Sequence, residues 1–232
     1  MSANKTPDTG MRRALYGRSK GKALRAYHAG LVEKLLPRLE IDAAGLSEPA
    51  RLFPFPVQEL RLEIGFGGGE HLAARAKEDA SVGFIGCEPF VNGVAKLLAV
   101  IDAEKRENIR IRMGDARALM ETLPEASLSR LYLLYPDPWP KRRHNKRRFV
   151  SPEMISQFAR VIKPGGELRF ATDIDDYAGW TLKRFLAAPE FRWRAGRADD
   201  WRLPWAGWRP TRYEAKARAE GRSSAYLTFV RL

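Results

Sequence analysis

The sequence predicts an α/β fold: a mostly parallel sheet with helices on both faces, in one domain that carries a basic N-terminal extension. Two observations predict this class. From about residue 57 to the end, strand-like apolar runs alternate with helix-like amphipathic runs, and that order is typical of parallel sheets. The chain has 232 residues, of which 44% are hydrophobic, enough for one such core and too few for two full domains.

Three segments are predicted along the chain. Residues 1–20 are polar and basic without apolar periodicity, which predicts a flexible tail. Residues 21–56 are expected to hold a helix, with apolar residues at helical spacing over 22–39 and Pro37 disturbing its end, followed by a linker. The main domain is predicted to occupy residues 57–232.

Within the main domain, each strand is an apolar run bounded by polar residues. Strands are expected in "LRLEIGF", "SVGFIGCE", "NIRIRMGD", "LSRLYLLYP" and "GGELRFAT", with late strands near "FRWRA" and "AYLTFVRL". Helical periodicity predicts helices from about Glu70, from about Asn92, after Asp115, near Pro152 to Ile162, and from about Asp175 to Ala187. Because ligands of such folds bind at the carboxyl ends of the strands, the functional residues are sought there.

The charge of the chain points to a polyanionic partner. Lys and Arg number 41 against 28 Asp and Glu, a formal net charge of +13, which suits a nucleic acid or an acidic membrane surface. No apolar stretch approaches the roughly 20 residues that span a bilayer, and the first residues lack the apolar core of a secretory signal. A cytoplasmic location is therefore expected.

Cysteine and histidine usage argues against a disulfide framework or a metal site. The single cysteine, Cys87, excludes an internal disulfide and a multi-cysteine zinc site, and its apolar surroundings predict core packing. His28, His71 and His144 show no spacing typical of metal ligands, so no metal is predicted.

A glycine-rich loop follows the first strand of the main domain. In "LEIGFGGGE", Gly65 and Gly67 stand between a strand and a helix, where glycines let the backbone turn tightly and approach a ligand. Glu88 ends the next strand about 20 residues later, which also matches the fingerprint of dinucleotide-binding proteins. The loop alone therefore leaves two cofactors open, a dinucleotide and S-adenosylmethionine.

Acidic residues at three successive strand ends favour S-adenosylmethionine. Glu63 beside the loop would repel an anionic pyrophosphate and suit a donor that carries a sulfonium and an ammonium. Glu88 can accept hydrogen bonds from ribose hydroxyls, and Asp115 ends the third strand, where an adenine amino group would lie. The alternative is that these carboxylates only cap the helices that follow them.

The segment "YPDPWPKRRHNKRR" joins a rigid carboxylate to a basic run. Asp137 lies between two prolines, so its backbone has few conformations to lose, and its carboxylate could accept hydrogen bonds from a guanine edge while Trp139 or Tyr135 packs on the base. Six of the eight residues from Lys141 to Arg148 are Lys or Arg, which favours phosphate binding over a merely solvated surface.

Taken together, "LEIGFGGGEHL", "GCEPF", "GDA", "YPDPWPKRRHNKRR", "ATDIDDYA" and "TRYEAKARAEG" resemble the bacterial tRNA (guanine-N7-)-methyltransferase family over most of the chain. The resemblance implies a Rossmann-like class I methyltransferase fold with a seven-stranded sheet. It also implies methyl transfer from S-adenosyl-L-methionine to N7 of guanine 46 in the variable loop of tRNA, without an obligate protein partner. One departure is Tyr135, where many relatives carry Phe, and the N-terminal tail matches the family less closely.

The resemblance also assigns residues. Asp137 is the implied active-site acid and lies near the donor. The donor-binding positions are Glu63, Glu88, Asp115 and Asp137, beside Gly65 and Gly67 of the loop. The substrate-binding positions are Lys141, Asp173, Thr211, Arg212, Tyr213 and Glu214. The RNA-binding positions are Arg143, His144, Asn145, Lys146, Arg147 and Arg148. For Thr211 and Glu214 a helix-capping box is an equally good interpretation of the spacing.

Guanine N7 carries a lone pair and no proton, so it can attack a sulfonium methyl group without a general base. Three rival functions stay open on the residues: an enzyme that methylates an exocyclic amine, a non-catalytic RNA-binding module, and an NAD-dependent enzyme. The tryptophans in "FRWRAGRADDWRLPWAGW" could stack on RNA bases, although packing against the core is favoured.

Overall fold

A computed structural model describes residues 21–42 and 45–232, and the predicted tail over residues 1–20 lies outside this range. The described residues form a seven-stranded sheet in the order β3-β2-β1-β4-β5-β7-β6. The strands are β1 (Glu59–Ile64), β2 (Val82–Glu88), β3 (Ile109–Met113), β4 (Leu128–Leu134), β5 (Ile162–Thr172), β6 (Phe191–Trp193) and β7 (Ala225–Arg231). Strands β1 to β5 pair in parallel, and β7 pairs antiparallel with both β5 and β6. The predicted mostly parallel α/β class is confirmed.

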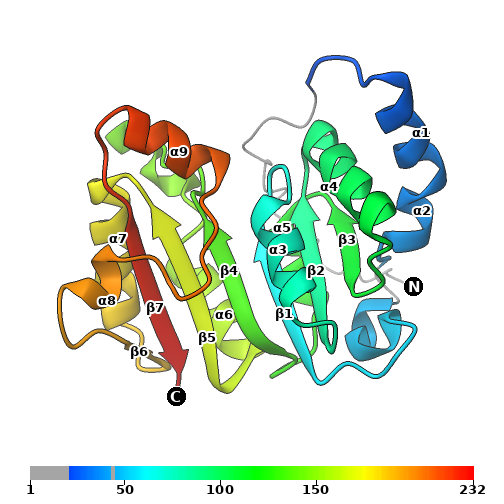
Figure 1. Ribbon diagram of the computed structural model, residues 1–232. Coiled ribbons are helices and arrows are strands. Elements are labelled where there is room, and N and C mark those ends of the chain that lie inside the picture. The colour runs from blue at the N-terminus through cyan, green and yellow to red at the C-terminus, as the bar shows by residue number, and fades with distance from the viewer. Residues whose placement is uncertain (1–20, 43–44) are drawn as a thin grey trace, which may run out of the picture.

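Helices cover both faces of this sheet (Figure 1). They are α1 (Ala26–Lys34), α2 (Leu36–Leu39), α3 (Glu70–Glu78), α4 (Val91–Glu104), α5 (Ala116–Thr122), α6 (Pro152–Val161), α7 (Asp175–Leu186), α8 (Asp199–Arg202) and α9 (Arg212–Ala219). Short 3-10 helices are η1 (Gly45–Ser47), η2 (Pro49–Leu52) and η3 (Arg142–Arg147). The ends follow local chemistry: α6, for example, begins where the Ser151 hydroxyl accepts from the Met154 N–H and Pro152 occupies the first turn.

Two apolar layers result, one on each face. The layer under α5, α6 and α7 is built on strand residues such as Leu62, Ile85 and Phe170, and the layer under α2, α3 and α4 on Phe84 and Ile111. Apolar runs buried on both faces are typical of parallel strands, and they place the carboxyl ends of β1 to β5 at one edge of the sheet. Helix α9 lies at that edge of the sheet in Figure 1.

Three details differ from the sequence expectations. The single N-terminal helix is divided at Leu35, because Pro37 has no N–H to continue the helical hydrogen bonds and its ring clashes with the carbonyl four residues earlier. The basic run forms η3 where a loop was expected, and α8 was not predicted.

The tryptophan-rich segment packs against the protein, as favoured from the sequence. Trp193 and Trp201 lie on one apolar layer, and Trp205 and Trp208 pack beside Tyr226 on the other face. Within residues 21–42 and 45–232, none of the helices combines the length and the apolar character that a membrane span needs.

Candidate functional site

A cavity of about 440 Å³ opens at the carboxyl ends of β1, β2, β3 and β4. Such a volume falls within the range of ordinary cofactor sites, about 300–1,000 Å³. The sequence-predicted residues that line it are Gly65, Gly67, Glu88, Asp115, Asp137, Arg147 and Tyr213. Residues from the glycine loop, two strand ends, the proline-rich loop and α9 therefore meet around one space.

The glycine loop is held in place by Glu88. Gly65 and Gly67 have φ of 70° and 58°, in the left-handed region that side chains disfavour. The Gly67 N–H donates to one Glu88 oxygen at 2.8 Å, and the Phe90 N–H donates to the other at 2.9 Å. Burial raises the pKa of Glu88 although these two hydrogen bonds favour its charged form. Each oxygen keeps a further lone pair that could accept from a ligand.

Helix α4 supports the same loop by close backbone contact. A Cβ built on Gly93 would lie only 2.1 Å from the carbonyl oxygen of Gly67. No side chain fits in that space, so the glycine sets how near the helix approaches the loop.

Asp115 combines the two roles considered for it. Its carboxylate accepts from the Arg117 N–H at 2.9 Å and so caps α5, while the residue lines the cavity. The Arg117 guanidinium lies 3.5 Å from the same carboxylate. Helix capping therefore leaves Asp115 in position to meet a ligand.

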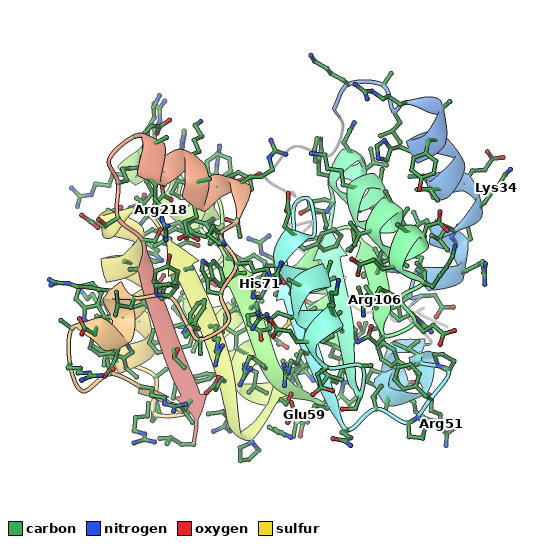
Figure 2. All side chains as sticks on the ribbon, viewed as in Figure 1. Lys34, Arg51, Glu59, His71, Arg106 and Arg218 are labelled. Atoms are coloured by element: carbon green, nitrogen blue, oxygen red, sulfur yellow. The ribbon has the colours of Figure 1, made fainter. Side chains whose placement is uncertain are left out.

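Glu63 does not line the cavity. Its side chain is buried, and one oxygen lies 2.6 Å from Nδ1 of His71 on α3. His71, labelled in Figure 2, packs in turn against the rings of Tyr132 and Trp208. The Glu63 carboxylate is thus engaged in a buried pair beneath the glycine loop, and its contact with the donor stays a prediction.

The proline-rich loop carries Asp137 at the mouth of the cavity. No group among the described residues donates a hydrogen bond to its carboxylate, and partial desolvation by the cavity walls raises its pKa above the ordinary aspartate value. The flanking residues Tyr135 and Trp139 have φ of 49° and 44°, left-handed values that cost a non-glycine residue about 1–3 kcal/mol. Such strain is typical of functional sites.

Most of the basic run lies at the surface next to Asp137. Lys141, Arg143 and Lys146 are exposed, while His144 packs edge-on to the Trp139 ring and Arg147 lies 4.9 Å from its centroid. In the amide orientation that satisfies its hydrogen bonds, the Asn145 side-chain nitrogen donates to the Trp139 carbonyl at 3.0 Å. The run therefore offers cations to solvent on one side and supports the loop on the other.

Arg148 departs from this arrangement. It was predicted to contact RNA, but it is only 1% exposed, and its guanidinium bonds to the Pro138 carbonyl and to Asp176. An RNA contact by Arg148 is not compatible with this burial, and the prediction for this residue is corrected.

Glu214 is also inside the protein. It is fully buried, one oxygen accepts from Nε1 of Trp208 at 2.5 Å, and the other accepts from Tyr226 and pairs with Arg218, which is labelled on α9 in Figure 2. The Thr211 hydroxyl accepts from the Glu214 N–H at 3.2 Å and caps α9. The structure therefore gives no support to the predicted substrate contact of Glu214, whereas the capping interpretation holds for Thr211.

Their neighbours on α9 face outward. Tyr213 is 62% exposed and lines the cavity, and its ring lies 3.6 Å from where a Cβ on Gly67 would stand. Arg212 is exposed. Asp173, at the end of β5, pairs with Arg222 at 2.8 Å and does not line the cavity.

Several further cavity residues were not singled out from the sequence, among them Phe90, Arg117 and Phe149. The Arg117 guanidinium lies 5.1 Å from the Phe149 ring centroid, so these two form part of one wall. Phe90 and Arg117 each stand two residues after an acidic strand end, Glu88 and Asp115, and this proximity was the available signal. In residues 21–42 and 45–232, no group of three or more His, Cys, Asp or Glu could hold a metal ion.

Comparison with known sequences gives a consistent assignment. Residues 57–227 match a family described as putative methyltransferase. A tRNA (guanine-N(7)-)-methyltransferase of Azorhizobium caulinodans is 54% identical over 219 residues, covering 94% of this chain and 95% of the relative. The protein of the same name from Rhizobium meliloti is 56% identical over 223 residues, with coverage of 94% and 95%.

Solved structures share the fold at low identity. The 16S rRNA methyltransferase KamB has a TM-score of 0.54 and 18% identity, covering 76% of this chain and 89% of its own. The 30S ribosomal A1408 methyltransferase from an uncultured bacterium has a TM-score of 0.51 and 16% identity, covering 83% and 95%. The methyltransferase family and this fold imply S-adenosyl-L-methionine as the methyl donor, which confirms the predicted cofactor. The chain belongs to the bacterial tRNA (guanine-N7-)-methyltransferase family.

Proposed function

We propose that the protein transfers a methyl group from S-adenosyl-L-methionine to N7 of guanine 46 in the tRNA variable loop. The observation that carries the proposal is the Asp137 carboxylate, which has no protein partner among the described residues and stands at the mouth of an acidic cavity beside exposed cations. The names of the relatives support tRNA and guanine N7. A cytoplasmic location goes with a tRNA substrate.

The residues around the cavity fit the methyl donor. Glu88 would accept from the ribose hydroxyls with the lone pairs that Gly67 and Phe90 leave open, and Asp115 would accept from the adenine amino group. Bound there, S-adenosyl-L-methionine supplies an electrophilic methyl group on sulfur. The carboxylates match the positive charge of the donor, whereas the pyrophosphate of a dinucleotide would be repelled.

Asp137 would act on the target base. A carboxylate accepts two hydrogen bonds side by side, which matches the adjacent N1–H and amino donors of guanine. Held in this way, guanine would present N7 and could attack without losing a proton, so orientation is the main demand on the protein. Orientation of reacting groups contributes roughly 7–11 kcal/mol in favourable intramolecular cases. Asp137 would also balance the positive charge that develops on the ring.

The exposed cations of η3 would hold the tRNA backbone. Arg143 and Lys146 are exposed and follow Asp137 closely in the chain, and the net charge of +13 favours binding of a polyanion. A phosphate grip of this kind makes affinity fall as salt rises, because each neutralised phosphate releases counterions.

The test is transfer of radiolabelled methyl from S-adenosyl-L-methionine to unmodified tRNA, followed by borohydride reduction and aniline cleavage. Scission at guanine 46 is the expected result, because only the N7-methylated base is lost under these conditions. Scission at another guanine would retain the chemistry and reject the position. Incorporation without scission would indicate methylation of an exocyclic amine.

The remaining rivals have their own signatures. Tight tRNA binding without donor binding would identify a non-catalytic RNA-binding module. Preference for a nicotinamide cofactor over the sulfonium donor would identify an NAD-dependent enzyme. Either result would overturn the proposal.

A further inference from the structure

Arg148 is the last residue of the basic run, yet it faces the interior. Its exposed fraction is 1%, whereas Arg143 and Lys146 of the same run are exposed. Arginine is almost never fully buried unless it is paired, because removing the guanidinium from water costs several kcal/mol. A surface grip on RNA cannot explain a cation in this place, so another role is required.

The contacts of Arg148 fix its guanidinium from three directions. Its Nε–H donates to the carbonyl oxygen of Pro138 at 2.8 Å, and its Nη2 pairs with Asp176 on α7. The rings of Tyr177 and Trp180, also on α7, lie 4.9 Å and 4.8 Å from its guanidinium carbon. Stacking and a charged hydrogen bond together leave the guanidinium little freedom.

The Pro138 carbonyl belongs to the residue directly after Asp137. Prolines 136, 138 and 140 lack an N–H, so the loop has few backbone donors with which to hold itself. On one side of Asp137 the Tyr135 N–H donates to the Ala171 carbonyl at 2.7 Å. On the other side the charged donor of Arg148 holds the loop. The left-handed Tyr135 and Trp139 need such outside support, because strained backbone persists only where its surroundings impose it.

We propose that Arg148 is a positioning residue for methyl transfer: from the interior it holds the Pro138 carbonyl and so fixes the direction of the Asp137 carboxylate at the cavity. This inference rests on the proposed function, because it assigns Arg148 to the step in which Asp137 orients the base. It also separates the basic run into outward cations for RNA and one inward cation for loop geometry. The short 3-10 turn of η3 is what turns the chain from one role to the other.

The variant Arg148→Lys tests the proposal, since lysine keeps the charge but loses the planar, stacked Nε donor. A misplacement of about 1 Å can cost up to about 100-fold in rate, and we expect kcat to fall about 10- to 100-fold. The KM for tRNA and the salt dependence of tRNA binding are expected to stay at wild-type values. A merely structural or RNA-binding role would not produce this division between kcat and KM.

Arg160→Lys is the matched control. Arg160 also donates to carbonyl oxygens, those of Met120 and Leu123, but between α5 and α6, away from the cavity. The same chemical change there is expected to lower the melting temperature and to leave kcat of the folded enzyme unchanged.

A double variant makes the test specific to Asp137. If Arg148 acts through Asp137, Arg148→Lys should lower single-turnover rates by less than about twofold once Asp137→Ala is present, because coupled residues are not additive. Should Arg148→Lys fail to fold, Asp176→Asn replaces it. The Asp176 side chain is 69% exposed, so Asp176→Asn removes the ion pair with Arg148 without changing the interior of the protein. A fall in kcat of about threefold is expected.

Each outcome is decisive. Wild-type enzyme that gives no N7-specific scission would refute the proposed function before Arg148 is considered. Wild-type scission together with an unchanged kcat in both Arg148→Lys and Asp176→Asn would overturn the positioning role alone. A raised KM and a reduced salt slope with unchanged kcat would return Arg148 to the RNA-binding surface. Full additivity with Asp137→Ala would also contradict the proposal.

Discussion

Two carboxylates, Asp137 and Glu214, were both predicted to contact the substrate but have opposite surroundings. Asp137 lines the cavity, keeps contact with solvent, and receives no hydrogen bond from the described residues. Glu214 is fully buried, and its two oxygens are engaged by Trp208, Tyr226 and Arg218. One acid faces the ligand space, and the other holds protein elements together.

The difference shows what decides the role of a carboxylate. An oxygen already engaged by protein donors is costly to redirect, because the donors left behind would be buried without partners. A carboxylate oxygen in a partly desolvated cavity is destabilised in its ionised form when it has no hydrogen-bond partner. A ligand that donates a hydrogen bond to it offsets this free-energy cost. Motif membership therefore places a residue near a site, whereas its remaining hydrogen-bonding capacity says whether it can meet the ligand.

The largest expected effect is that of Asp137→Ala on turnover. Removing one oriented group that stabilises developing charge typically costs about 100- to 1,000-fold in kcat, and we expect a loss in that range. Thermal stability should be unchanged or slightly higher, because a desolvated, unpaired charge is removed. Methyl-transfer kinetics and thermal denaturation measure the two quantities. Wild-type turnover would remove Asp137 from the mechanism.

Glu214→Ala is expected to act first on stability. It leaves the Trp208 and Tyr226 donors without their acceptor, at about 1–3 kcal/mol for each unsatisfied group, partly relieved where Arg218 reaches solvent. We expect the free energy of unfolding to fall by about 2–4 kcal/mol in urea denaturation. Glu214→Gln should recover part of this. If stability stays at the wild-type level while guanine binding is lost, Glu214 is a substrate contact after all.

The comparison also shows how far the sequence could lead. Periodicity placed the strands β1 to β5, and acidic residues at strand ends located Glu88, Asp115 and Asp137 around one cavity. These positions follow from the topology of a parallel sheet, because strand ends share an edge. The pattern could not distinguish Arg143 from Arg148, which have the same chemistry.

Burial separated those two arginines, and burial is set by a 3-10 turn and by aromatic residues of α7 about 30 residues later in the chain. The surroundings of Glu63 could not be predicted for a related reason. Its partner, His71, is contributed by the next helix, and no local pattern indicates that the two side chains would pair. Local sequence patterns thus predict where a side chain lies, while its partners in the tertiary structure decide whether it is free to contact a ligand.

Gly93→Ala tests the part of the cavity that would hold the methyl donor. The new methyl group would press on the Gly67 carbonyl and displace the glycine loop, whereas the Glu214 network is built on other residues. We expect affinity for S-adenosyl-L-methionine to fall by about tenfold or more, measured by calorimetry, with tRNA affinity retained. Gly30→Ala is the matched control, because nothing lies within 4 Å of a Cβ at that position of α1. Equal donor affinity in the two variants would refute this account of the loop.

The smallest expected effect is a shift in the acid limb of the pH profile. Desolvation raises the pKa of Asp137, and only its ionised form can accept two hydrogen bonds from guanine. As pH falls through this raised pKa, Asp137 gains a proton and kcat should decline, at a higher pH than an ordinary aspartate with a pKa near 3.9 would allow. The decline approaches tenfold per pH unit only below that pKa, so near neutrality the change is at most a few fold.

Glu88 is the competing source of such a limb, because burial raises its pKa as well. The two are separated by measuring kcat with donor and tRNA both saturating: Asp137→Asn should remove the limb, and Glu88→Gln should leave it in place.

The pH dependence of stability has the same sign for both groups. Their raised folded-state pKa means that the ionised form is penalised, so stability present at acid pH is lost as pH rises through that pKa. Asp137→Asn should therefore flatten the kcat profile and remove only the Asp137 contribution from the stability profile, whereas a kcat limb that survives in Asp137→Asn would assign the titration to another group.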